Sequence, residues 1–119
     1  METKEKKTLL QKIKLIDDDS LAIAQKYYSL LSAIGNSPLT EREIQLVAFT
    51  AIKGNISYSS NREEFCTLYK SSSPTINNMI SKLKKVGILI KESGKIKVAP
   101  KYLLDFNNNI VLQISLIHG

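Results

Sequence analysis

The stretch "KSSSPTINNMISKLKKVGILIKESGKIKV", residues 70–98, decides the fold, because it contains a helix start, a helix stop and a hairpin in succession. Ser73 suits an N-cap, and Pro74 suits the first helical position, where its missing N–H costs nothing. An apolar stripe follows at helical spacing: Ile76, Met79 or Ile80, Leu83 and Val86. Gly87 then supplies a C-terminal stop. The pattern therefore predicts a helix that ends at Val86.

Two short β-like runs follow this helix, at residues 88–91 and 95–98, and a turn with Ser93 and Gly94 joins them. Such a pattern is typical of a β-hairpin. We expect four apolar side chains to point towards the core: Ile88, Ile90, Ile96 and Val98. The lysines between them, Lys91, Lys95 and Lys97, are then expected to be exposed.

The same stretch concentrates the positive charge of the chain. The 119 residues carry a net charge of +6. Residues 70–101 contain eight lysines and one acid, Glu92, a balance of +7 that leaves −1 for all other residues. A general enrichment in lysine, isoleucine and asparagine is the competing explanation, but it does not explain why the excess is confined to one segment. A local excess of this kind indicates a surface that meets a polyanion.

Three further helices are expected upstream. The first follows the aspartates at 17–19 and stops at Gly35. The second begins at a capping box formed by Thr40 and Glu43, with apolar positions at 44, 47, 48 and 51, and ends at Gly54. The third is short, about residues 61–70. It is capped by Ser60 with Glu63 or by Asn61 with Glu64, and it buries Phe65, Leu68 and, less clearly, Tyr69.

The two ends of the chain suggest strands. Residues 7–16 fit either a helix or a strand, and we favour a strand. The run "KYLLDF", residues 101–106, is consistent with a last helical turn, and residues 107–109 with a turn. Residues 110–117 alternate in the manner of a strand that needs a partner, and the N-terminal run could be that partner.

Three helices followed by a hairpin describe a winged helix-turn-helix, so the predicted fold class is mainly α with a small β-hairpin (α+β) and possible extra terminal strands. The segments "LTEREIQLVAFTAI", "EEFCTLYKSSSPTINNMISKLKKVGILIK" and "GKIKVAPKYLL" resemble the winged-helix domain of MarR-type and related bacterial or phage regulators. The resemblance covers about residues 39–104. Residues 1–38 add a strand or helix and a supporting helix, and residues 105–119 add a strand, all within one compact domain.

The resemblance implies that residues 73–86 form a recognition helix that enters a major groove, preceded by the helix at residues 63–69. It also implies that residues 88–98 form a wing that touches the DNA backbone or the minor groove. Regulators of this type dimerise through long terminal helices, whereas this chain ends in an asparagine turn and an apparent strand. A homodimer therefore remains an open alternative.

Candidate DNA contacts follow from the residue types. Serine and threonine at a helix N-terminus can bind a phosphate, asparagine can reach base edges, and lysines can neutralise phosphates. The candidate DNA-binding residues are Ser72, Ser73, Thr75, Asn77, Asn78, Ser81, Lys82, Lys85, Lys91, Lys95 and Lys97. We therefore expect a double-stranded DNA-binding protein, sequence-specific or general, that acts as a transcriptional or replication regulator.

Other functions are less well supported by the sequence. No phosphate-binding loop, metal-ligand cluster or nucleophile paired with an internal histidine is present, so no enzyme activity, cofactor or metal is expected. The single cysteine, Cys66, is expected to be a small core or boundary residue. No signal peptide or membrane span is expected, so we expect a cytoplasmic protein of a bacterial cell or a phage-infected host, with no membrane partner.

The serious alternative is a winged-helix protein-interaction module in a phage particle or in a replication or transcription assembly. An apolar strand at an edge can add to a partner's sheet, and the strand predicted at Ile110 to Ile117 is the candidate contact.

Overall fold

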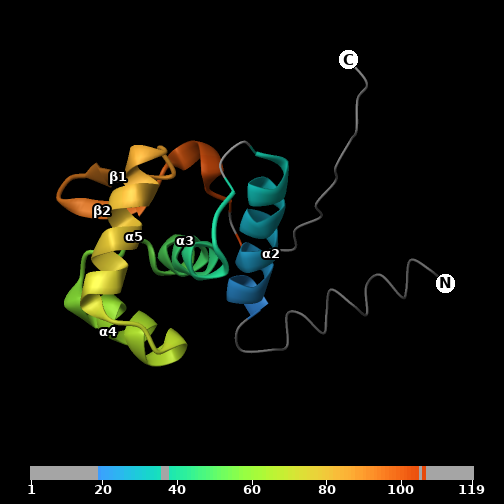
Figure 1. Cartoon of the computed structure of the whole chain (residues 1–119). Coiled ribbons are helices and arrows are strands. Elements are labelled where there is room, and N and C mark those ends of the chain that lie inside the picture. Colours follow the sequence, from blue (N-terminus) through green and yellow to red (C-terminus); the bar gives the residue numbers. More distant parts are fainter. Residues whose placement is uncertain (1–18, 36–37, 105, 107–119) are drawn as a thin grey trace, which may run out of the picture.

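The computed structural model describes residues 19–35, 38–104 and 106 (Figure 1). Within these ranges the elements follow in the order α2 (Asp19–Ile34), α3 (Glu41–Lys53), α4 (Ser59–Tyr69), α5 (Ser73–Lys85), β1 (Leu89–Glu92), β2 (Lys95–Val98) and the 3-10 helix η1 (Pro100–Tyr102). The structure is mainly helical with a small antiparallel hairpin, which confirms the predicted α+β class. The strands predicted at residues 7–16 and 110–117 lie outside the described residues. None of the helices described is long and apolar enough to cross a membrane.

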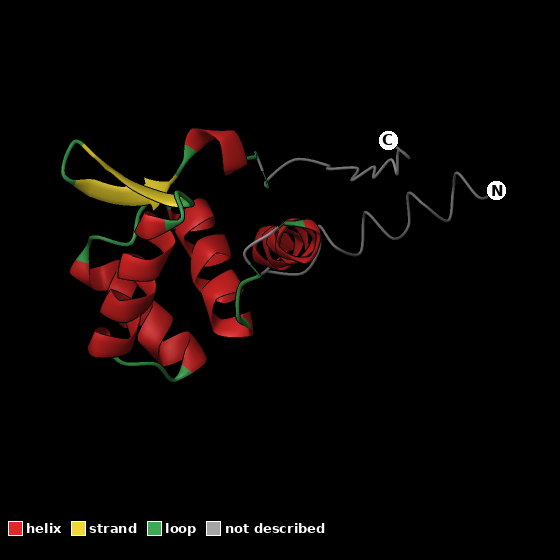
Figure 2. Ribbon diagram, turned by 45° about the horizontal axis from the view of Figure 1, so that its top comes forward, coloured by secondary structure: helices red, strands yellow, loops and turns green. Residues whose placement is uncertain are grey.

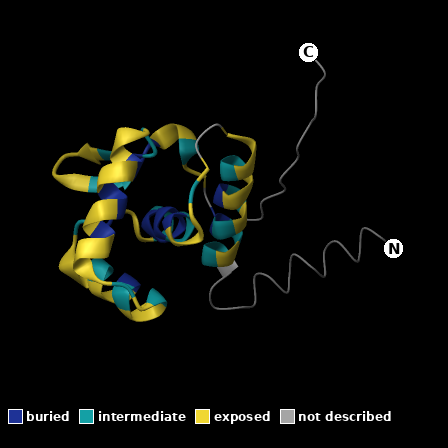
Figure 3. Ribbon diagram, viewed as in Figure 1, coloured by how far each residue is buried: buried dark blue, intermediate teal, exposed yellow. Residues whose placement is uncertain are grey.

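Helix α3 lies at the centre of the fold. Figures 1 and 2 show α2 on one side of it, and α4, α5 and the hairpin on the other. Five consecutive residues of α3 are buried: Leu46, Val47, Ala48, Phe49 and Thr50. The sequence pattern predicted only one buried face for this helix. Because neighbours cover α3 on both sides, its burial extends around the helix axis (Figure 3).

Helix α2 is joined to the far end of the described chain through its tyrosines. The buried Tyr28 donates a hydrogen bond from its hydroxyl to the carbonyl oxygen of Tyr102, at 2.6 Å. The rings of Tyr27 and Tyr28 also contact the ring of Phe106, with centroids 5.6 and 5.7 Å away. Burial, together with the neighbouring Tyr27, raises the pKa of the Tyr28 hydroxyl, so it stays a donor.

The ends of α3 and α5 largely follow the predicted chemistry. Thr40 and Glu43 form the expected capping box, and Gly54 ends α3 in the left-handed region with φ 95°. Gly87, with φ 84°, ends α5 in a Schellman motif, because the Ile88 N–H donates to the Leu83 carbonyl at 3.0 Å.

Two details of α5 differ from the prediction. The N-cap is Ser72 rather than Ser73, because the Ser72 hydroxyl accepts from the Thr75 N–H. Val86, predicted in the apolar stripe, is 41% exposed, since it is the C-cap and no longer follows the helical spacing.

The start of α4 also differs from the prediction. The helix begins at Ser59, and Tyr58 occupies the N-cap position without a side-chain cap. In place of the predicted Ser60 or Asn61 caps, the buried Asn55 accepts from the backbone N–H groups of Ser57 and Tyr58 at 2.9 and 3.1 Å. A turn formed by the preceding asparagine therefore leads into a helix that has no side-chain cap.

The buried face of α4 is narrower than predicted. Phe65 is fully buried, and its ring meets that of Phe49 edge-on with centroids 5.4 Å apart. Leu68 is 50% exposed, so its predicted burial is wrong. The contacts of Phe65 with α3 and of Tyr69 with Phe65 orient the helix so that Leu68 points away from the core.

The segment between α3 and α4 lies beside the hairpin. Ile56 is fully buried, and its N–H donates to the Ile96 carbonyl at 2.9 Å. The Ile96 N–H in turn donates to the Ser57 hydroxyl at 2.6 Å. The segment is therefore fixed to β2 by two hydrogen bonds rather than being a free loop.

The hairpin orients its residues differently from the prediction. Leu89 pairs with Val98, and both are buried, while Ile88, Ile90 and Ile96 are only partly buried. Lys97 is also partly covered instead of exposed. The reason is that Ile88 belongs to the stop motif of α5, so β1 begins one residue later and Leu89 takes the inward position. The turn at Ser93 and Gly94 forms as predicted, with φ values of 54° and 79°, as a two-residue hairpin requires.

Candidate nucleic-acid interface

Helix α5 has one apolar face and one polar face. Ile76, Met79, Ile80 and Leu83 are buried, which confirms that part of the predicted stripe. On the opposite side, at spacings of three and four residues, lie Pro74, Asn78, Ser81 and Lys85, all exposed. No acidic residue belongs to α5. Figure 3 shows one side of α5 as exposed, and the side chains of Asn78, Ser81 and Lys85 make that side polar and basic.

At the N-terminal turn of α5, the side chain of Ser72 caps the helix itself. The Ser72 hydroxyl lies 2.9 Å from the Thr75 hydroxyl and accepts from the Thr75 N–H. Ser73 is exposed as the first helical residue. Of the three predicted phosphate contacts at this end, Ser72 and Thr75 thus have a local partner in the fold.

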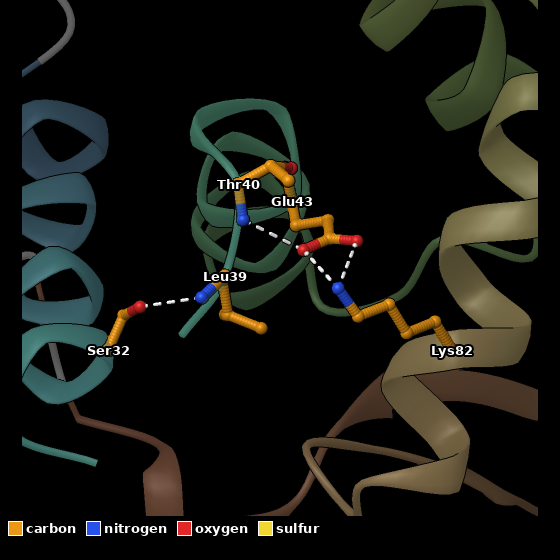
Figure 4. A network of polar contacts seen from close by, with 5 residues as sticks. All are labelled: Ser32, Leu39, Thr40, Glu43 and Lys82. Carbon is orange, nitrogen blue, oxygen red and sulfur yellow. Dashed lines mark hydrogen bonds and ion pairs between the residues drawn. The ribbon is translucent and has the colours of Figure 1, made fainter. Parts of the chain in front are cut away.

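Lys82 forms an ion pair with an acid from another helix. Its ammonium lies 3.0 Å from both carboxylate oxygens of Glu43 on α3 (Figure 4). The Glu43 side chain is only 8% exposed, whereas that of Lys82 is 48% exposed. The same carboxylate accepts from the Thr40 N–H at 2.8 Å and so completes the capping box.

The protonation state of Glu43 follows from these contacts. Burial alone would raise the pKa of the Glu43 carboxyl, but the hydrogen bonds from Thr40 and the Lys82 ammonium outweigh it and hold the pKa below its usual value. Glu43 is therefore an anion at neutral pH, and its negative charge compensates the positive charge of Lys82 within the fold.

Asn77 also has a partner from a neighbouring helix. Arg62 on α4 donates from Nη1 to the Asn77 side-chain oxygen at 2.7 Å, and from Nε to the Ile56 carbonyl at 2.9 Å. Asn78, the adjacent candidate, is exposed, and its side chain makes no hydrogen bond with the residues that the structure describes. The two asparagines are thus held differently.

The lysines of the hairpin also differ in whether their ammonium groups have a partner in the fold. Lys97 forms an ion pair with Glu92 at 2.6 Å. The Lys95 ammonium lies 5.5 Å from the centroid of the Tyr58 ring, a cation–π contact. Lys91 is exposed.

Four exposed lysines remain on α5 and the hairpin without an ion pair to any acid in the described ranges: Lys84, Lys85, Lys91 and Lys95. We call them the basic surface. Figures 1 and 2 show the C-terminal end of α5 beside the hairpin, so two elements contribute to this surface.

Several residues of this region were not among the predicted contacts. Lys84 shares the exposure of Lys85, and its place beside the polar stripe was readable from the sequence. Glu43, Arg62 and Tyr58 come from other segments, and no local pattern pairs them with α5 or the hairpin.

Comparisons of the chain with protein-family models, curated proteins and solved structures yield no match. Among the described residues, no group of three or more His, Cys, Asp or Glu side chains could hold a metal ion.

Proposed function

We propose that the chain is a winged helix-turn-helix protein that binds double-stranded DNA through α5 and the β1–β2 hairpin, as a cytoplasmic regulator of transcription or replication. The observation that carries the proposal is the basic surface, Lys84, Lys85, Lys91 and Lys95, next to an α5 face without acids. Unpaired lysines suit a phosphate backbone, because each phosphate contact releases counterions.

The dimensions of α5 support the same function. An α-helix with its side chains is about 10–12 Å wide, and the major groove of B-DNA is about 12 Å wide. The exposed stripe contains Asn78, Ser81 and Lys85, which can contact base edges and phosphates. In this proposal Lys82 and Lys97 are not counted among the phosphate contacts, because each already pairs with a carboxylate.

The test is binding to a mixed-sequence duplex across a salt series. The native chain is expected to bind with an affinity that falls steeply with salt. Lys84→Gln with Lys85→Gln should reduce the slope of log K against log salt by about 1.8, since each phosphate contact contributes about 0.9. Lys26→Gln, an exposed lysine on α2, is the matched control and should leave the slope unchanged. Absence of salt-dependent binding by the native chain would contradict the proposal.

The competing function is a protein-interaction module, because an acidic protein surface would also match the basic surface. Polyglutamate serves as the discriminating probe at the same salt concentration. DNA binding predicts that the duplex displaces polyglutamate from the native chain. Equal or tighter binding of polyglutamate would favour a protein partner.

A further inference from the structure

The side chain of Arg62 connects three parts of the fold. Its Nε donates to the Ile56 carbonyl at 2.9 Å, and its Nη1 donates to Asn77 Oδ1 at 2.7 Å. Ile56 is itself fully buried and joined to β2 through the Ile96 carbonyl. Because a guanidinium is planar, two bonds from different nitrogens fix the plane of the whole group.

The contact also determines the orientation of the Asn77 carboxamide. A guanidinium can only donate hydrogen bonds, so the oxygen of Asn77 must face Arg62. The NH2 group of Asn77 must then point away from Arg62, and Asn77 is exposed. Asn78, without such a partner among the described residues, keeps both amide orientations.

We propose that Arg62 is a positioning residue that holds Asn77 with its amide donors presented to hydrogen-bond acceptors on base edges, such as purine N7, guanine O6 or thymine O4. This inference rests on the proposed DNA-binding function. A side chain ordered before binding loses less conformational freedom on binding, so the contact favours the matching base over others. Arg62 thus acts on specificity through Asn77, without a phosphate contact of its own.

The first test needs no DNA. Side-chain amide ¹⁵N relaxation of the native chain should show Asn77 ordered and Asn78 mobile. Arg62→Lys keeps the charge but lacks the planar two-bond geometry, so Asn77 should become as mobile as Asn78. Equal mobility of the two asparagines in the native chain would overturn the inference, whether or not the variant folds.

The second test uses duplexes selected by the native chain from a pool with a randomised centre. Arg62→Lys should reduce the preference for the selected duplex over a shuffled one about tenfold, the scale of one specific base contact. Its salt slope on the shuffled duplex should not change, because the charge is kept. Asn77→Ala should cause the same loss, and the double variant no more than either, since both act through one contact. Arg42→Lys on α3 is the matched control and should retain the preference.

The outcomes separate the two proposals. No salt-dependent binding by the native chain overturns both DNA binding and the role of Arg62. Salt-dependent binding without preference among duplexes overturns only the role of Arg62. The role of Arg62 alone is also overturned if Arg62→Lys keeps the preference for the selected duplex, or if the losses of preference add up in the double variant.

Discussion

The ion pair between Glu43 and Lys82 is unequal in burial, so its two members should not be equivalent. Lys82→Met removes the cation and leaves a buried anion, which we expect to cost about 2–3 kcal/mol of the free energy of unfolding. Glu43→Gln leaves a half-exposed ammonium that water can solvate, and glutamine can still accept from the Thr40 N–H. We expect it to cost about 1 kcal/mol.

Chemical denaturation of both variants measures the difference. Lys84→Met is the control on the same helix, and it should change stability by less than about 0.5 kcal/mol, because Lys84 is exposed and pairs with no described acid. A greater loss in Glu43→Gln than in Lys82→Met would contradict the burial argument.

The lowered pKa of Glu43 predicts a loss of stability in acid. The folded-state pKa lies below the unfolded-state value, so the ionised carboxylate stabilises the fold fully above the unfolded-state pKa of about 4.3. This contribution is lost as the pH falls from that value through the folded-state pKa. Thermal unfolding between about pH 6 and 3 should therefore show a shallower decline in Glu43→Gln than in the native chain. Parallel declines would show that other carboxylates carry the acid sensitivity.

At the scale of elements, the start of α4 depends on a residue outside the helix. Asn55→Ala would leave the N–H groups of Ser57 and Tyr58 without their acceptor, and we expect it to cost about 1–3 kcal/mol. Asn55→Asp keeps the acceptor oxygen and should lose less. Ser60→Ala, at one of the caps expected from sequence, should be nearly neutral, because no cap bond forms there. Urea midpoints of the three variants test this order. A large loss of stability in Ser60→Ala would show that a cap within the helix does start α4.

Across the whole molecule, the structural features that depend only on residues close together in the sequence were predictable. The capping box at Thr40 and the stop at Gly87 are examples, because their partners lie within a few residues. The exposure of Leu68 and the inward position of Leu89 were not predictable, since each depends on how a helix or strand meets its neighbours. The contact between Arg62 and Asn77 likewise joins two helices, and no periodicity indicates it.

In the candidate site, too, local features were predictable from the sequence and contacts between distant residues were not. Local composition predicted the lysine-rich helix and hairpin, since charge accumulates within one continuous segment. It could not predict which lysines are neutralised, because Glu43 approaches Lys82 from a helix 39 positions away in sequence. Ion pairing therefore leaves six of the eight lysines of residues 70–101 without a described acid, and the four of these six on α5 and the hairpin form the basic surface.

The basic surface should also make the stability of the whole molecule depend on salt. A net charge of +6, concentrated on α5 and the hairpin, produces repulsion that the folded state must overcome. Salt screens such exposed charges within a Debye length of about 10 Å at 0.1 M, whereas the buried carboxylate of Glu43 is screened less. We therefore expect sodium chloride, raised from about 50 to 300 mM, to increase the melting temperature by about 2–5 °C.

The same salt should weaken binding to a duplex, so stability and affinity should move in opposite directions. Lys84→Gln with Lys85→Gln should melt higher than the native chain at low salt and respond less to added salt, because two of the repelling charges are gone. Calorimetry on the native chain, this variant and Lys26→Gln measures the effect, and the Lys26→Gln response should match the native one. A melting temperature that falls with salt would mean that the attraction in the ion pairs of Lys82 and Lys97 outweighs the repulsion among the exposed lysines. The basic surface would then not destabilise the free protein.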